Sequence, residues 1–412
     1  MIDSVRHMHK SVAWRGLVIG AVAVTESAAD IYAPAQSALQ KFFCCSCTLI
    51  ALTMSINLLG MAIASLIFGG LSDYIGRKKA LLGALVLFAV ASLGAVFATS
   101  IGSLIFWRFL QGVGGGGAPV CAYSVISDLY KGKERAKELS LMGMFTALVP
   151  AIAPIFGSVL LYVLSWRAIF MMLFVFALIC AVGVYLYLEE SHVVQEKVPV
   201  KEMIVRLLKV YRETFASGIF CKLLLAIGIV MGMLWVEIAH LPFALMDSLG
   251  VSPALFSVML SINVGTYILF ARVNQKLVMR TPLWELVLLG FGCSLVSWLL
   301  IGGVFVCVAI WPQDSQIFAW ALQMAKLPGS AGFAFLLPNL SALLFATRPK
   351  DFGAVSALMS FAHMILGSVL VYVMGYFYNQ TFYPMFILQA LCMMVLVGLF
   401  WKLGKKQVIL SA

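Results

Sequence analysis

Twelve apolar stretches, each long enough to cross a lipid bilayer as an α-helix, follow one another along the chain. A membrane-spanning helix needs about 20 consecutive, mostly apolar residues. Hydrophobic residues make up 63% of the 412 residues and charged residues 11%, whereas a soluble domain is roughly half apolar and a quarter charged. The candidate spans are residues 14–33, 48–71, 80–99, 103–126, 139–164, 167–188, 219–241, 254–275, 283–308, 317–345, 353–377 and 382–401. We therefore predict an all-α membrane protein with twelve transmembrane helices.

The longest polar stretch divides these spans six and six. It covers residues 189–217, and from Pro199 to Phe215 its apolar and basic residues alternate at helical spacing. This pattern is typical of a helix that lies along the membrane surface. We expect a six-helix half at 1–188, a cytoplasmic linker at 189–217 and a second six-helix half at 218–412. Two such repeats predict a secondary transporter whose substrate site lies between the halves.

The net charge of +11 could indicate a nucleic-acid partner, but the basic residues fall in short loops between the apolar stretches. They concentrate in every second loop, at residues 77–79, 131–137, 276–280 and 348–350, and in the central linker. The intervening loops hold only Lys41 and Arg167. Loops rich in Lys and Arg stay on the cytoplasmic side. We therefore expect no nucleic-acid partner, a multi-pass protein of the bacterial inner membrane, and two cytoplasmic termini.

Charged residues inside the spans are few, and such residues are costly in lipid and usually functional. They occur in the first, fourth, seventh and tenth spans, which hold equivalent places in the four three-helix units. We expect these spans to line one cavity, with acids and bases at overlapping depths that allow pairing. The residues are Glu26, Asp30, Arg108, Glu237 and Lys326, with His240 on the same helix face as Glu237.

Proton coupling is the function that we infer for these charges. Desolvation favours the protonated form of a carboxylate, a nearby cation opposes it, and alternating access changes both effects. Static ion pairs that hold helices together are the alternative. That alternative stays open for Arg108, Glu237 and Lys326, whereas Glu26 and Asp30 favour coupling or substrate contact.

Three short segments show a more particular order of residues than a membrane span requires. Residues 70–79 (GLSDYIGRKK) form a loop after the second span, where glycines permit a tight turn. Residues 108–118 (RFLQGVGGGGA) are rich in small residues, which let helices approach closely. Residues 149–158 (VPAIAPIFGS) contain two prolines, which bend helices.

These segments resemble signature motifs of the major facilitator superfamily. Residues 30–34 (DIYAP) and the Pro-Asn at 338–339 are similar to motifs of its Bcr/CflA branch, and the layout also resembles MdfA-like drug:proton antiporters. The resemblance implies a cytoplasmic gate, a bend in the fifth helix that is typical of antiporters, and a proton and substrate site. The gate residues are Gly70, Asp73, Gly76 and Arg77, the bend residues are Pro150, Pro154 and Gly157, and the site adds Tyr32, Gln111 and Asn339 to the charged residues above.

We therefore expect a proton-coupled secondary transporter that exports small organic molecules by alternating access, as in multidrug efflux and antibiotic resistance. The alternative is a dedicated exporter or importer of one polar or zwitterionic metabolite, because Glu237 and Lys326 depart from the branch pattern. The chain lacks the zinc, nucleophile and phosphate-binding motifs of common enzymes and ATPases. A channel is also disfavoured, because the chain has few charged rings.

We expect no enzyme activity, no cofactor and no bound metal. The expected partners are protons, a small-molecule substrate and the lipid bilayer, and we expect a monomer. Cys44, Cys45 and Cys47 cluster in one outer loop, but their spacing matches no zinc pattern.

Overall fold

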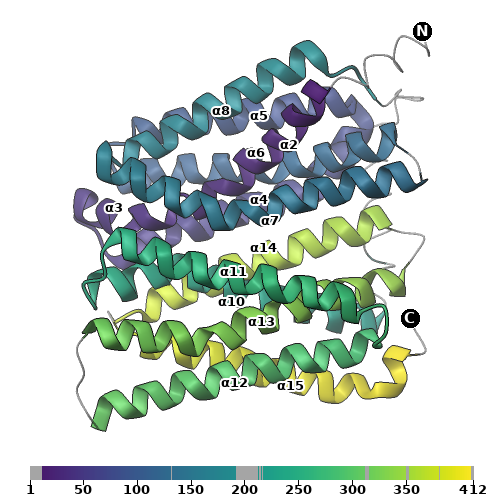
Figure 1. The fold of residues 1–412 in the computed structure, drawn as a ribbon. Coiled ribbons are helices and arrows are strands. Elements are labelled where there is room, and N and C mark those ends of the chain that lie inside the picture. Colours follow the sequence, from purple (N-terminus) through teal and green to yellow (C-terminus); the bar gives the residue numbers. More distant parts are fainter. Residues whose placement is uncertain are drawn as a thin grey trace. The chain divides into compact units, whose positions relative to one another are not determined.

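The computed structural model describes residues 12–130, 132–191, 212, 215, 217–310, 315–348, 352–379 and 381–409, and these residues form helices without strands (Figure 1). The chain divides into two compact units, Met1–Tyr211 and Arg212–Ala412, and each is described by itself. The expected surface helix at 199–215 falls almost entirely outside the described residues. The three-part division at 189–217 therefore stays a prediction.

Twelve long helices within the described residues correspond to the twelve predicted spans. The first unit contains α2 (Val12–Asp30), α4 (Cys47–Ile75), α5 (Arg77–Val96), α6 (Ile101–Leu129), α7 (Gly132–Val163) and α8 (Trp166–Tyr187), with short η1 (Ala33–Ala35) and α3 (Gln36–Phe43) after α2. The second unit contains α10 (Gly218–Pro242), the π-helix η2 (Phe243–Asp247), α11 (Pro253–Leu277), α12 (Leu283–Ile310), α13 (Ser315–Thr347), α14 (Phe352–Phe377) and α15 (Tyr383–Ile409). The predicted helical class is confirmed.

Ten helical segments of the described chain are long and apolar enough to cross a membrane. The remaining long helices are α6 and α7. Helix α6 has 29 residues, but its glycines and two buried polar residues, Arg108 and Gln111, make it less apolar. In α7 the described residues include the apolar stretch Ile152–Val163. These lengths and compositions are those of a multi-pass membrane protein.

The first predicted span, 14–33, runs three residues past the end of α2 at Asp30. Pro34 has no backbone N–H, so it cannot donate the helical hydrogen bond to the Asp30 carbonyl. The chain turns at Ile31 and Tyr32 and resumes in η1 and α3. Helix α3 ends at Cys44, which adopts a left-handed conformation with φ of 48°. Asp30 consequently lies at a helix end rather than inside a continuous helix.

The glycine-rich stretch of α6 is a packing surface. A Cβ atom on Gly112 would overlap the Asn57 carbonyl oxygen of α4, and one on Gly114 would overlap the backbone of α5. Asn57 also donates a 2.8 Å hydrogen bond to the Arg108 carbonyl oxygen. The small residues therefore bring α4 and α5 against the backbone of α6, where they hold the polar residues of this helix in place.

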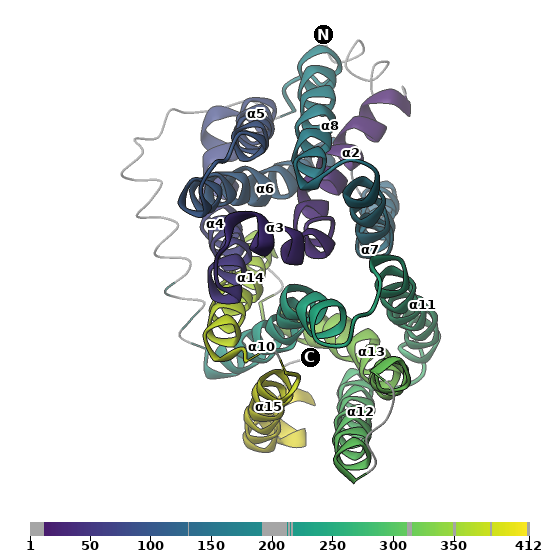
Figure 2. The same ribbon diagram turned by 90° about the vertical axis from the view of Figure 1, so that its left-hand side faces the viewer.

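The two units differ in how their third and sixth helices pack. In the first unit, α5 and α8 pack along each other. In the second unit, α12 and α15 share few contacts, and Figure 2 shows them apart, with α10 and α13 above them in this view. Side chains of α12, α13 and α15, together with α10, line a pocket at this place.

Candidate functional site

Asp30 is a buried carboxylate at the end of α2. Its relative exposure is 5%. Within the part of the chain that the structure describes, it forms neither a hydrogen bond nor an ion pair. Glu26 lies one turn earlier on α2 and is half-buried. Burying an ionised carboxylate without a partner is far more costly than burying a neutral carboxylic acid, so the position suits a group that gains and loses a proton.

Arg108 of α6 lies next to the α2 break and is completely buried. Its guanidinium carbon lies 4.3 Å from the centre of the Tyr32 ring, in a cation–π contact. It donates a 2.7 Å hydrogen bond to Gln111 Oε1 and long, 3.4 Å bonds to the carbonyl oxygens of Ala28 and Thr53. One terminal nitrogen, Nη2, has no hydrogen-bond partner in the described part of the chain. The guanidinium is therefore held in place, but one of its nitrogens keeps hydrogen-bond donors without an acceptor in the described residues.

Further hydrogen bonds fix the two neutral members of this cluster. The Tyr32 hydroxyl and Thr53 Oγ1 lie 2.6 Å apart, and Thr53 also donates to the Ile50 carbonyl oxygen. Gln111 donates a 2.8 Å bond to Ser92 of α5. Helices α2, α4, α5 and α6 thus converge on one polar cluster inside an apolar unit.

The fifth long helix, α7, contacts the same place. A Cβ atom on Gly157 would overlap the Ile31 carbonyl oxygen, so only glycine lets α7 approach the α2 break this closely. Pro154 is buried on the same helix. The side chain of Pro150 lies outside the described part. The segment predicted to bend the fifth helix therefore meets the residues next to Asp30.

In the second unit, Glu237 of α10 forms an ion pair with Lys326 of α13, with 3.0 Å between Oε2 and Nζ. Gln389 of α15 donates a 3.0 Å hydrogen bond to the other carboxylate oxygen, Oε1. The three side chains lie in the pocket between α10, α12, α13 and α15. The pair thus belongs to a pocket lined by the second unit alone, and its membership of the expected common cavity stays a prediction.

The remaining predicted site residues of the second unit lie away from this pair. Asn339 is 13 residues beyond Lys326 on α13, a rise of about 20 Å, and its amide donates to Asn274 of α11 at 2.9 Å. His240 is buried, with Nδ1 3.2 Å from the Val236 carbonyl oxygen and its ring 6.0 Å from that of Tyr378. Neither residue lines the Glu237–Lys326 pocket.

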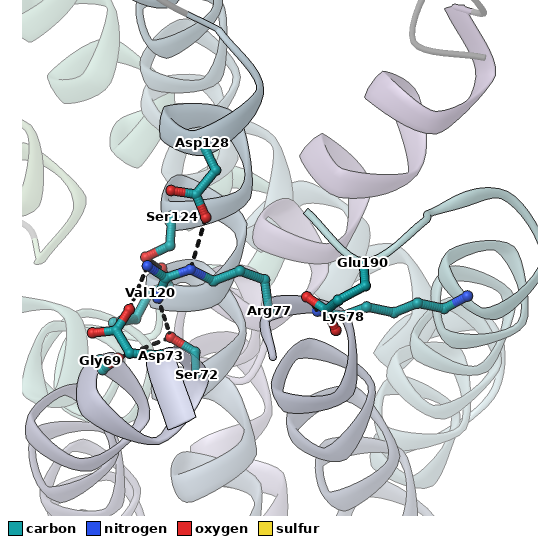
Figure 3. A network of polar contacts seen from close by, with 9 residues as sticks. All are labelled: Gly69, Ser72, Asp73, Arg77, Lys78, Val120, Ser124, Asp128 and Glu190. Atoms are coloured by element: carbon teal, nitrogen blue, oxygen red, sulfur yellow. Dashed lines mark hydrogen bonds and ion pairs between the residues drawn. The ribbon is translucent and has the colours of Figure 1, made fainter. Parts of the chain in front are cut away.

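A charged network joins the C-terminal ends of α4 and α6 to the N-terminal end of α5 (Figure 3). Arg77 forms ion pairs with Asp73 and with Asp128 of α6, the latter at 3.0 Å. It also donates to Ser72 Oγ at 2.5 Å. Gly76 has a φ of 100°, which allows the tight turn between α4 and α5. Gly70, on the last turns of α4, is buried. The four predicted gate residues thus lie in one turn and its adjoining helix ends.

All nine cysteines are free thiols. Cys44 is exposed in the first unit and Cys307 is exposed in the second. Burial, and then the neighbouring Cys47 thiol, raises the pKa of Cys45. No group of three or more His, Cys, Asp or Glu in the described residues has a geometry suited to a metal ion.

A model of the Major Facilitator Superfamily matches residues 18–310, which is most of the chain. The chain belongs to the Major Facilitator Superfamily. It is therefore a membrane transporter rather than a member of an enzyme family, and the first of its two six-helix units is matched in nearly its full length.

Curated relatives in this superfamily match over most of their length. The chloramphenicol resistance protein CraA of Acinetobacter baumannii is 27% identical over 372 residues, which cover 89% of this chain and 86% of the relative. The multidrug resistance protein MdtL of Shewanella oneidensis is 27% identical over 333 residues, covering 79% and 78%.

Solved structures of the superfamily share the fold. A D-xylose–proton symporter superposes with a TM-score of 0.71 at 15% identity, covering 94% of this chain and 97% of the symporter. The likeness at this identity concerns the fold, and the expected major facilitator architecture is confirmed.

The sequence prediction omits several residues of these networks, among them Asp128, Gln389 and Glu190. Asp128 lies at the end of α6, and Gln389 lies inside α15, a helix with few polar residues. Neither residue belongs to a motif. Glu190 accepts a 3.2 Å hydrogen bond from the backbone N–H of Lys78, near the start of α5, where a carboxylate is favoured by the helix dipole. Only Asp128 left a signal, because it is an acid at the C-terminal end of the fourth span, which the basic loops predict to lie on the same side of the membrane as Arg77.

Proposed function

We propose that this major facilitator protein exports small, mainly lipophilic organic molecules in exchange for protons. The supporting observation is Asp30, a carboxylate that is buried at a helix break and unpaired among the described residues. A buried acid bound in a strong ion pair resists protonation, whereas this one can take up a proton without breaking such a pair.

Arg108 supplies the second part of the proposal. Its guanidinium lies against Tyr32, two residues after Asp30. A protein cation in this position opposes protonation of Asp30 when the two approach and favours it when they separate. A movement of α2 against α6 would therefore couple proton uptake to the conformational change.

The printed names of the relatives give the substrate class. CraA is named for chloramphenicol resistance and MdtL for multidrug resistance. By analogy we propose drug efflux for this chain, with the protein acting as a monomer in a bacterial inner membrane. The excess of basic residues in alternate loops supports two cytoplasmic termini.

The decisive experiment uses the full-length protein in liposomes with an imposed pH gradient. Internal pH is followed while lipophilic cations, neutral antibiotics and polar metabolites are added in turn. The parent is compared with Asp30→Asn, which mimics the protonated acid, and with Glu285→Gln, which removes an exposed carboxylate from α12.

Several unrelated drugs should move protons in the parent and in Glu285→Gln but not in Asp30→Asn. Proton movement with a single polar metabolite would instead identify a dedicated transporter. Substrate flux that ignores the gradient in all three proteins would remove proton coupling and leave Asp30 a structural role.

A further inference from the structure

One face of α11 is apolar for most of its length and basic at its C-terminal end. The helix packs along α13 and lies at an edge of the second unit (Figure 2). Asn274 is buried on the side of α13, where it accepts a hydrogen bond from Asn339. Val258, Leu269 and Val273 are exposed, and the relative exposure of Leu269 reaches 60%. In a multi-pass membrane protein, an exposed apolar helix face of this kind meets lipid tails.

Arg272, Lys276 and Arg280 continue this face, and we call them the basic stripe. They follow one another at intervals of four residues, so each lies about 6 Å further along the helix and is turned by about 40° from the one before. The helical path extends to Arg280, because the backbone N–H of Thr281 donates to the Leu277 carbonyl oxygen at 2.9 Å. All three basic residues are exposed. Their side chains therefore share one side of α11 over about 12 Å.

The acids of the second unit leave the basic stripe uncompensated. Its members are the only basic residues between Asp247 and Asp314, and Glu285 is the only acid in that part of the sequence. Glu285 lies in the first turn of α12 and is exposed. Within the described residues, no member of the stripe forms an ion pair or a side-chain hydrogen bond. The stripe therefore keeps an excess of positive charge that an anion from outside the chain can offset.

The surroundings of the stripe decide which anion fits. Met279, which follows Lys276 by three residues, is 83% exposed, and Val273 lies beside Arg272. The cations are therefore interleaved with exposed apolar side chains. Guanidinium groups match the geometry of a phosphate, and Lys and Arg at a membrane surface attract anionic lipids. A lipid with a charged headgroup can meet the cations and the apolar face together, whereas a soluble anion meets the cations alone.

We propose that the basic stripe of α11 binds the headgroup of an anionic phospholipid, whose acyl chain lies along the apolar part of the same face. The site belongs to the second unit, whereas the Asp30–Arg108 cluster belongs to the first. Lipid binding there needs neither transport nor a proton, so the proposal is independent of the proposed function.

Native mass spectrometry of the full-length protein in detergent micelles tests it. Phosphatidylglycerol, which is anionic, and phosphatidylcholine, which is zwitterionic and carries the same acyl chains, are titrated separately, and the lipid-bound fraction gives a Kd for each. The parent protein should bind phosphatidylglycerol at least about tenfold more tightly. Glycerol 3-phosphate in about hundredfold excess should not displace this lipid, because it has the phosphate without the acyl chains.

Two charge-matched variants assign the preference to the stripe. Arg272→Gln, Lys276→Gln and Arg280→Gln combined should bring the two Kd values within about twofold of each other. Lys79→Gln, Arg212→Gln and Lys222→Gln combined remove the same number of charges from positions outside α11 and should keep the preference.

Equal binding of the two lipids by the parent protein would overturn the proposal. Displacement of phosphatidylglycerol by glycerol 3-phosphate would also overturn it, because the stripe would then bind soluble anions. The same loss of preference in both triple variants would show that the overall positive charge, rather than the stripe, selects the lipid. Because the first two outcomes concern the parent protein, they decide the proposal even if a variant fails to fold.

Discussion

Tyr32 makes two contacts that substitutions can separate. Its hydroxyl is hydrogen-bonded to Thr53, and its ring lies under the Arg108 guanidinium. Thr53 keeps its bond to the Ile50 carbonyl oxygen when the tyrosine hydroxyl is lost. The ring contact has no such replacement, because Arg108 is fully buried and Nη2 already lacks a partner.

Tyr32→Phe should therefore cost about 1 kcal/mol of unfolding free energy, the value of one neutral hydrogen bond. Tyr32→Leu should cost about 2 kcal/mol more, because a desolvated cation–π contact is lost as well. Unfolding by denaturing detergent in mixed micelles measures both values. Equal losses in the two variants would show that the stability comes from the Tyr32 hydroxyl alone and that its ring contact with Arg108 adds nothing.

At the level of the helix, α6 depends on the absence of side chains at particular glycines. A Cβ atom on Gly112 would lie on the Asn57 carbonyl oxygen. A Cβ atom on Gly102, at the N-terminal end of the same helix, would meet nothing within 4 Å. The two glycines therefore form a matched pair for the same substitution.

Gly112→Ala should destabilise the protein by about 1–3 kcal/mol, because α4 must move away from α6. Gly102→Ala should be neutral or stabilising by up to about 1 kcal/mol, because alanine favours a helix. Thermal unfolding of the two purified variants provides the comparison. If both lose stability alike, close packing of α4 on α6 is not what Gly112 provides.

Helix positions follow from the sequence to within a few residues, because apolar length and basic loops are local properties. The break after α2 was harder to predict, since the span is apolar on both sides of Asp30 and only Pro34 marks its end. The short helix α3 was missed because Gln36, Gln40 and Lys41 make it too polar to be read as part of a membrane span. Hydropathy alone cannot separate one long helix from two that meet at a turn.

The members of the candidate site could be listed from the sequence, but not their grouping. Glu237 and Lys326 are visible as charges in apolar helices. Their similar expected depths in the membrane predicted that the two side chains could form an ion pair. Gln389 carries no charge and gave no signal. Asn339 and His240 share helices with Lys326 and Glu237, yet helix rotation and rise direct them to Asn274 and toward Tyr378.

For the whole molecule, the distribution of Lys and Arg predicts the orientation in the membrane. A membrane-impermeant maleimide added to intact cells should label Cys44, which is exposed in the loop after α3. A Lys79→Cys variant, at an exposed position next to the Arg77 network, should add a further labelled site only after the cells are permeabilised. The opposite result would invert the assigned orientation.

The free cysteines also allow a distance within the chain to be measured with labels on native residues. Cys44 and Cys307 are the two exposed thiols, and one lies in each compact unit. The half-exposed cysteines are first replaced by serine. Nitroxide spin labels on Cys44 and Cys307 then give one distance between the units by double electron–electron resonance. Alternating access requires the distance distribution to shift between populations when pH or substrate changes. The working cycle can thus be followed with labels on native residues.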